Sequence, residues 1–254
     1  MNIIEWNIGY GANPEIIFKE LEKYMNDTFI FMILEVVPQA YEKFTNMFAG
    51  KATLEYSLDY RKPGKYDGKN RKLGVMIATS KDINVKDAGV FDRTLYPDRT
   101  LYECIEVDGR NLKIVALHSI TGCSHLSSKS INFCSFAEVI DDFKPDIVAM
   151  DANEPETDHF EIKNMKFFER NGKGARIFFE ALDDLGLRDS FTINYDVNRF
   201  VEGMPLTISH MINGKKPVRY DFVFVNEKIE VHDVSYDYDA AKKATADHAI
   251  ILLT

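Results

Sequence analysis

The chain has 254 residues, of which 45% are hydrophobic, and no linker rich in Pro, Gly or Ser divides it. We therefore expect one domain, over residues 1–254, with a large buried core. A formal net charge of −9 excludes tight, indiscriminate wrapping of nucleic acid, which needs many cationic contacts, but it leaves a phosphate substrate open.

The amino-terminal part predicts a strand over residues 2–6, followed by Asn7 in a loop that contains glycines. Asn7 is then either a turn-forming residue or a polar group at the end of a strand. Asn13 and Pro14 predict the start of a helix, because they suit the cap and the first helical position.

A second buried strand is predicted over residues 29–37, and Glu35 is its one charged residue. A carboxylate in such a run must be paired, hydrogen-bonded, metal-bound or at an exposed end, because an isolated buried charge is very costly. Pro38 ends the strand and places Glu35 near its end, which favours a metal ligand over an accidental edge residue.

A helix over residues 39–48 and a strand over residues 53–58 precede a basic loop at residues 61–72, which also carries Tyr66. This loop is a candidate for holding a polyanionic substrate, with Arg71 as one contact. A solvated hairpin tip is an equally good interpretation.

Strands are predicted over residues 73–79, 101–107 and 112–117, and the turn Asp108-Gly109 joins the last two. Arg99 precedes this hairpin and could reach a phosphate. His118 closes the last strand, where a histidine is usually a satisfied core or edge residue.

A helix over residues 129–142 leads to a short buried strand over residues 147–150, which ends at Asp151. Asn153 follows two positions later, so both side chains point to the same side of the strand. This pattern fits an Asx turn or a pair of groups that activate water and donate to a phosphate oxygen.

The last part of the chain predicts a helix over residues 175–185 and a strand over residues 218–225. Asp221 interrupts this apolar strand and must have a partner if it is buried. Asp247 and His248 precede a final strand over residues 250–253 and offer an acid beside a titratable imidazole.

Cysteine usage and hydropathy indicate the compartment. Cys104, Cys123 and Cys134 form neither a CxxC pair nor an even set, so we expect free thiols in a reducing compartment, the cytoplasm. No basic segment with a long apolar core opens the chain, and no apolar run reaches membrane-spanning length. We expect no signal segment, no membrane span and no obligate protein partner.

The polar residues singled out above share a position at or near the end of a predicted buried strand. Their carboxylates and amides are the oxygen ligands that Mg²⁺ prefers, and the imidazoles could bind phosphate and move protons. Histidines without a convergent cysteine argue against a structural zinc site. The sequence has no GxxxxGK[ST] loop and no GxSxG elbow, which removes support for nucleotide-driven chemistry and serine hydrolysis.

The order of these motifs resembles the endonuclease/exonuclease/phosphatase superfamily, which includes deoxyribonuclease I, abasic-site endonucleases and neutral sphingomyelinases. Each motif is short, but the set is specific and spans nearly the whole chain. The matching pieces are Glu5-Trp6-Asn7, Leu34-Glu35, Ala116-Leu117-His118-Ser119, Met150-Asp151-Ala152-Asn153, Arg219-Tyr220-Asp221-Phe222 and Ala246-Asp247-His248.

The resemblance implies an α/β fold of four layers, with two mixed β-sheets packed face to face and helices outside. It implies that Glu35 binds Mg²⁺, or alternatively Mn²⁺, with Asn7 and Asp247 beside it. The remaining groups would form the catalytic set: Asp151 deprotonates the attacking water, Asn153 aligns it, His248 held by Asp221 binds the phosphate, and His118 acts as a general acid.

The sequence departs from the family pattern near His118, because no glutamate that could support this histidine occurs between Glu55 and Glu103. His118 is then expected to lean on Asp59 or Asp67, or to act differently. Ala246 replaces a usual serine and Val36 an often polar residue. Neither change removes a catalytic group.

The leading hypothesis is a Mg²⁺-dependent nuclease or related phosphodiesterase that hydrolyses phosphodiester bonds. The first alternative is a phosphatase or phosphodiesterase acting on a small phosphoester, such as a phosphoinositide, a phospholipid headgroup or a nucleotide. Aromatic and cationic residues of the loop at residues 61–72 favour nucleic acid, whereas the acidic net charge does not. A catalytically silent binding module is the third reading.

Overall fold

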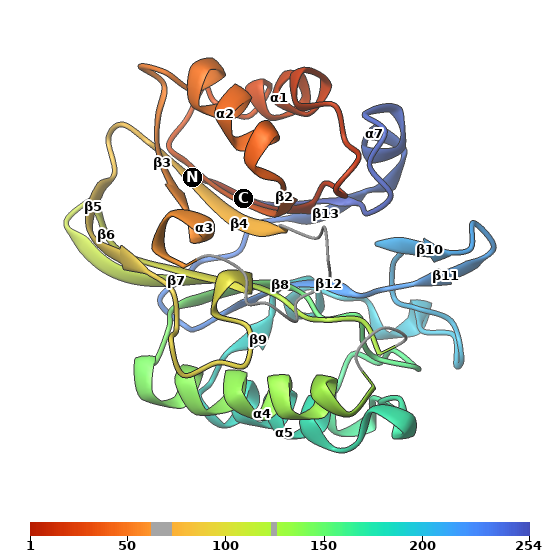
Figure 1. The fold of residues 1–254 in the computed structure, drawn as a ribbon. Helices are drawn as coiled ribbons and strands as arrows, with labels where there is room; N and C mark the ends of the chain where they lie inside the picture. Colours follow the sequence, from red (N-terminus) through yellow and green to blue (C-terminus); the bar gives the residue numbers. More distant parts are fainter. Residues whose placement is uncertain (62–72, 123–125) are drawn as a thin grey trace.

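The computed structural model describes residues 1–61, 73–122 and 126–254. Its centre is a pair of six-stranded β-sheets that pack face to face, with helices on the outer side of each sheet (Figure 1). The pairs β1–β2 and β7–β8 are parallel and their neighbours are antiparallel, so both sheets are mixed. The predicted four-layer α/β sandwich is therefore confirmed.

The first sheet has the strand order β13 (Val234–Asp237), β14 (Ile250–Leu253), β1 (Asn2–Asn7), β2 (Phe29–Val36), β4 (Gly74–Ser80), β3 (Ala52–Tyr56). The second has the order β5 (Asn84–Gly89), β6 (Thr100–Val107), β7 (Arg110–His118), β8 (Ile147–Asp151), β12 (Asp221–Val225), β9 (Arg188–Asp189). A separate two-stranded hairpin consists of β10 (His210–Ile212) and β11 (Lys216–Val218).

Helices cover the outer face of each sheet (Figure 1). The first sheet carries α1 (Pro14–Glu22), α2 (Pro38–Met47) and α7 (Tyr238–Lys243), and the second carries α4 (Leu126–Phe143) and α5 (Gly174–Asp184). Shorter helical turns are α3 (Ser57–Tyr60), α6 (Ser190–Ile193), η1 (Pro97–Arg99), η2 (Ile162–Asn164), η3 (Glu169–Asn171) and η4 (Val197–Arg199). Asn13 caps α1 as predicted, because its side chain accepts a hydrogen bond from the Glu15 amide.

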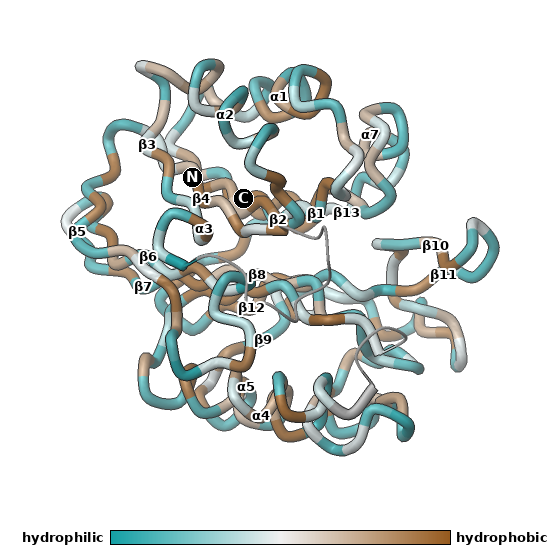
Figure 2. The backbone as a smooth tube through the Cα atoms, in the orientation of Figure 1, coloured by the Kyte–Doolittle hydropathy of each residue, from teal (hydrophilic) through white to brown (hydrophobic). Residues whose placement is uncertain are grey.

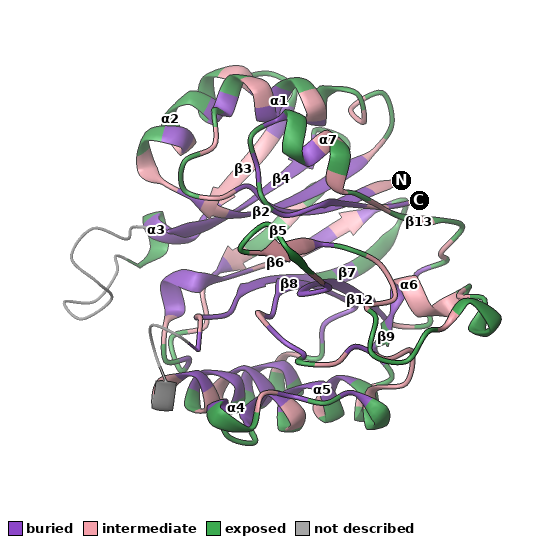
Figure 3. Cartoon of the chain, turned by 90° about the vertical axis from the view of Figure 1, so that its right-hand side faces the viewer, coloured by how far each residue is buried: buried purple, intermediate pink, exposed green. Residues whose placement is uncertain are grey.

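Strand β2 shows why the central runs of the sequence are apolar throughout. Ile30, Met32 and Leu34 pack between the two sheets, whereas Phe31 and Ile33 pack under the helices of the first sheet. A strand buried on both faces has no polar side, so its sequence does not alternate between apolar and polar residues. Figure 2 shows the hydrophobic colour concentrated in the strands, and Figure 3 shows the same strands buried while the outer helix faces are exposed.

The predicted strand over residues 29–37 differs from the observed one at Glu35. The pairing of β2 with β4 shifts register between Ile33 and Val36, and Glu35 takes a positive φ of 59° in this bulge. A bulge interrupts the regular alternation of side chains between the two faces of a strand and gives the bulged side chain a new direction. Glu35 therefore leaves the apolar layers at the end of the sheet.

Two further strand predictions are too long. The strand predicted over residues 53–58 ends at Tyr56, because Ser57 accepts the Val75 amide and donates to the Asp98 carbonyl, which starts the turn α3. The strand predicted over residues 218–225 is broken between β11 and β12.

Some predictions lie outside the described residues: Tyr66, Asp67, Arg71 and Cys123. Cys104 and Cys134 are free thiols, as expected. Among the described residues, no helix combines the length and the apolar character needed to span a membrane.

Candidate active site

Neighbouring strands of the second sheet bring three of the predicted residues into one row. The parallel register of β7 and β8 pairs His118 with Asp151, and the antiparallel register of β8 and β12 pairs Asp151 with Asp221. On the first sheet, Asn7 ends β1 and Glu35 lies in the bulge of the adjacent β2. The backbone topology thus places these side chains at the same end of the sandwich.

Asp151 is buried and held by amide donors. Its Oδ1 accepts the Asn153 backbone amide at 2.9 Å, and its Oδ2 accepts the side-chain amides of Asn7 at 2.9 Å and Asn153 at 3.0 Å. Burial, followed by the charge of Asp221, raises the pKa of Asp151, while His248 and His118 oppose the rise. Asn153 has a φ of 50°, and this conformation folds its side chain back toward Asp151.

Asp221 and His248 form a buried pair. The Nδ1 atom of His248 lies 2.8 Å from Oδ2 of Asp221. Burial by itself would lower the pKa of His248, but the charges of Asp221 and Asp151 outweigh it and raise the pKa to about 10. The imidazole is therefore a cation at neutral pH, and its Nε2 atom remains for another partner.

Glu35 contacts the loop after β1 and the end of β7. Its Oε2 accepts the Tyr10 amide at 3.2 Å, and its Oε1 lies 3.3 Å from Nε2 of His118. Burial would raise the pKa of Glu35, but the hydrogen bond from His118 and the nearby positive charges of His248 and Arg99 lower it to about 2. Glu35 is therefore ionised.

His118 contacts Glu35 and Arg99 rather than Asp59, and Asp67, the other acid expected to support it, lies outside the described residues. The Nη1 atom of Arg99 lies 3.0 Å from Nδ1 of His118. Because a guanidinium nitrogen only donates, Nδ1 accepts and the ring proton lies on Nε2, facing Glu35. Arg99 is itself buried, 3% exposed, and contacts His118. A direct contact between Arg99 and a phosphate stays a prediction.

A cavity of about 440 Å³ joins most of these groups. Among the predicted residues, Glu35, Asp151, Asn153, Asp247 and His248 line it. Asn7, His118 and Asp221 support lining residues from behind through the hydrogen bonds and contacts given above. Arg71 lies outside the described residues. The predicted residues that the structure describes therefore converge, and Arg99 joins them through its contact with His118.

Two residues near the site were not predicted. His210, on β10, lines the cavity, and no local pattern identifies it because it follows an irregular segment. Glu5 is fully buried, and neither carboxylate oxygen has a hydrogen-bond partner within the described residues. Burial and the charges of Asp221 and Asp151 raise its pKa well above the ordinary value. An acid inside an apolar strand is the same signal that identified Glu35.

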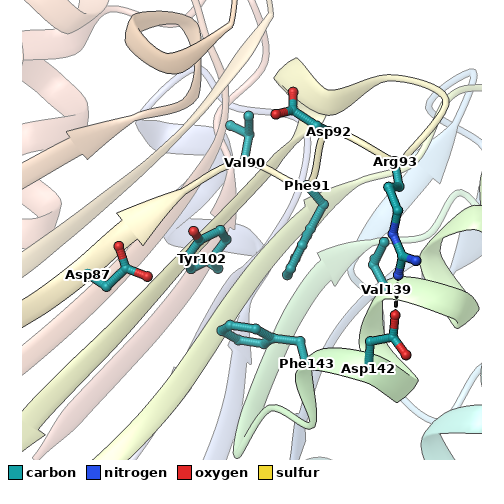
Figure 4. Close-up of a pocket in the computed structure, with 9 residues that line it drawn as sticks. All are labelled: Asp87, Val90, Phe91, Asp92, Arg93, Tyr102, Val139, Asp142 and Phe143. Atoms are coloured by element: carbon teal, nitrogen blue, oxygen red, sulfur yellow. Dashed lines mark hydrogen bonds and ion pairs between the residues drawn. The ribbon is translucent and has the colours of Figure 1, made fainter.

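A second cavity, of about 350 Å³, lies between β5, β6 and the end of α4 (Figure 4). Phe91, Tyr102 and Phe143 pack there with ring centroids 5.0–5.3 Å apart, so the rings fill the space between them. Arg93 pairs with Asp142 at its rim (Figure 4). This cavity contains none of the predicted site residues.

Solved structures are similar to this chain over its whole length. A Bacteroides thetaiotaomicron protein of the endonuclease/exonuclease/phosphatase family is 15% identical, with a TM-score of 0.61 over 100% of this chain and 96% of that one. The human Nocturnin catalytic domain, with a bound sulfate anion, is 13% identical, with a TM-score of 0.66 over 100% and 93%. This chain has the endonuclease/exonuclease/phosphatase fold. The 3′ phosphatase NExo from Neisseria, bound to a product DNA hairpin, also matches, at 16% identity and a TM-score of 0.65 over 100% and 98%.

The endonuclease/exonuclease/phosphatase fold confirms the architecture that the motifs implied. No protein-family model matches the sequence, and no curated protein matches it.

The donor atoms at the site fit the divalent cation that the resemblance implies. Glu35 and Asp247 line the same cavity, and Glu35 is ionised. A Cβ atom on Gly9 would lie 3.1 Å from Oδ1 of Asp247, so glycine gives the carboxylate room. Asn7 keeps its Oδ1 oriented through the Gly9 amide at 3.0 Å. An all-oxygen donor set of this kind suits Mg²⁺.

Proposed function

We propose that this chain is a Mg²⁺-dependent phosphodiesterase, and specifically a nuclease. The observation that carries the proposal is the single cavity into which Glu35, Asp151 and His248 all open. An ionised acid can hold a cation, a carboxylate with a raised pKa can accept a proton from water, and an imidazolium can stabilise the charge on a phosphate, which together suit hydrolysis of a phosphodiester.

Asp151 is the proposed general base. Its raised pKa favours accepting a proton from water, and the amides of Asn7 and Asn153 fix the direction of its oxygens. Asn153 is half-buried at the cavity wall and would align the same water. Attack then proceeds in line with the leaving oxygen.

His248 is the proposed phosphate ligand. Asp221 holds Nδ1, so the protonated ring presents Nε2–H to a phosphate oxygen and stabilises the charge that develops in the transition state. Glu35, Asn7 and Asp247 would hold Mg²⁺, and the ion would supply a positive charge to polarise the phosphoryl group and to stabilise the leaving group.

His118 fits a positioning role better than the general-acid role that the resemblance implies. Its Nε2–H faces Glu35, its Nδ1 faces Arg99, and its ring is 2% exposed. We infer that His118 keeps Glu35 ionised and oriented toward the cation.

The substrate is proposed to be nucleic acid. NExo, which has this fold, was solved with a product DNA hairpin, and this supports the proposal. A small phosphoester is the alternative, favoured by the net charge of −9. We also infer a cytoplasmic location, which the free thiols of Cys104 and Cys134 support.

The test is hydrolysis of supercoiled plasmid, a single-stranded oligonucleotide and bis(p-nitrophenyl) phosphate, each with Mg²⁺ or with a chelator. We expect Mg²⁺-dependent cleavage of at least one nucleic acid. Turnover of the small ester alone would reject the nuclease and favour the alternative. No turnover of any substrate by the folded protein would reject catalysis and leave the silent binding module.

A further inference from the structure

The hairpin β10–β11 places an additional imidazole at the cavity. His210 forms an isolated antiparallel bridge with His248, and the Ala249 amide donates to the Ser209 carbonyl at 2.7 Å. The buried Ser209 hydroxyl also accepts the amides of Tyr220 at 2.8 Å and Asp221 at 3.2 Å. His210 is therefore fixed to the same backbone that carries the Asp221–His248 pair.

In both imidazoles, Nδ1 forms a hydrogen bond with an oxygen atom. In His210, Nδ1 lies 2.9 Å from the Asp247 carbonyl oxygen, which only accepts, so Nδ1 carries the hydrogen. In His248, Nδ1 lies 2.8 Å from the Asp221 carboxylate. A metal-binding histidine usually donates its other ring nitrogen to a carbonyl or carboxylate in this way, because the bond fixes the tautomer and raises the basicity of the ligand.

The two rings and one carboxylate lie close enough to share an ion. Ligand atoms of His210, Asp247 and His248 all lie within 4.8 Å of one another, and the ring centroids are 4.3 Å apart. Zinc bonds of about 2.0–2.2 Å put two ligands of one ion roughly 3–4 Å apart. His210 is half-buried and Asp247 is exposed, so the site is open to solvent and leaves a position for water.

We propose that His210, Asp247 and His248 form a second cation site, selective for a nitrogen-preferring transition metal such as Zn²⁺. Two imidazoles and one carboxylate suit zinc, whereas Mg²⁺ prefers oxygen ligands. The site shares Asp247 and His248 with the proposed hydrolytic site but does not depend on hydrolysis. A bound transition metal would displace the proton from Nε2 of His248 into solvent and would compete with phosphate for that atom.

The first test is isothermal titration calorimetry of the chelator-treated full chain with ZnCl₂, without substrate. We expect His210→Ala to weaken zinc binding at least about 10-fold, because even the loss of a group that supports a ligand costs about 10- to 100-fold. The control is His232→Ala, an exposed histidine beside the carboxyl end of β14, which should bind zinc like the wild type. Equal affinities for wild type and His210→Ala would overturn the proposal.

X-ray absorption of the zinc-loaded wild-type chain tests the same site without a variant. We expect scattering from two imidazole ligands, and one or none would overturn the proposal. Because neither measurement uses a substrate, a protein that binds zinc but hydrolyses nothing would reject the nuclease and retain this site. A protein that hydrolyses nucleic acid but does not bind zinc would retain the nuclease and reject this site.

Discussion

At the scale of single residues, the sequence identified charged groups but not their conformations. The pattern of apolar strands interrupted by acids located Glu35 and Asp221, since buried carboxylates must have partners. The bulge that turns Glu35 outward depends on pairing with β4, which is distant in sequence. His210 was missed for a similar reason, because its place depends on a bridge to His248.

Removal of the His248 side chain from the Asp221–His248 pair should lower the rate of hydrolysis. We predict that His248→Ala lowers kcat about 10²- to 10³-fold, the usual cost of removing one donor to a transition-state oxyanion. Circular dichroism should show that the fold is retained, and His232→Ala serves as the control. A kcat within twofold of wild type, on the order of experimental error, would exclude His248 as the phosphate ligand.

The same pair should make stability depend on pH. Because the pKa of His248 is raised from 6.5 to about 10 in the folded state, its contribution is full below pH 6.5 and is lost as the pH rises toward 10. We predict that the free energy of unfolding, from urea titrations, falls over this window by a few kcal/mol, since one pKa unit corresponds to about 1.4 kcal/mol.

The control for this pH effect is Asp221→Asn, which removes the charge that holds the proton on His248. The decline in unfolding free energy between pH 6.5 and 10 should be smaller in this variant than in the wild type. An equal decline in both proteins would show that other groups cause it.

At the scale of elements, the central strands and the long helices could be predicted because hydrophobic periodicity is local. The Asp108-Gly109 turn is also local, and both residues take the positive φ values that it requires, 51° and 72°. The short strands β5, β9, β10 and β13 were not predicted, since they owe their form to tertiary pairing. The break between β11 and β12 also depends on tertiary contacts, because the Ser209 hydroxyl accepts hydrogen bonds from the backbone amides of Tyr220 and Asp221 there.

Ser209 should therefore stabilise the junction on which Asp221 and His210 depend. Ser209→Ala leaves the buried amides of Tyr220 and Asp221 without this acceptor, and we predict a loss of about 1–3 kcal/mol in unfolding free energy. The matched control is Thr45→Ala, whose exposed hydroxyl bonds a helix carbonyl. Equal stabilities of the two variants would contradict the role of Ser209.

At the scale of the whole molecule, the order of six short motifs predicted the four-layer fold although identity to solved structures is 13–16%. The reason is physical. Two stacked mixed sheets bring the ends of β1, β2, β7 and β8 to one edge, so polar residues that end these strands must meet there. Roles and substrate do not follow from topology, because they depend on side-chain contacts and on the shape of the cavity.

The central claim is that Asp151 activates water in this cavity for attack on a phosphate. The most direct measurement is the initial rate of Mg²⁺-dependent oligonucleotide hydrolysis by Asp151→Asn, with the exposed Asp141→Asn as control. We predict a folded protein whose rate is about 10²- to 10⁴-fold below wild type, because an amide cannot accept the proton, and an unchanged rate for the control. A folded Asp151→Asn protein that hydrolyses the oligonucleotide at the wild-type rate would contradict the account.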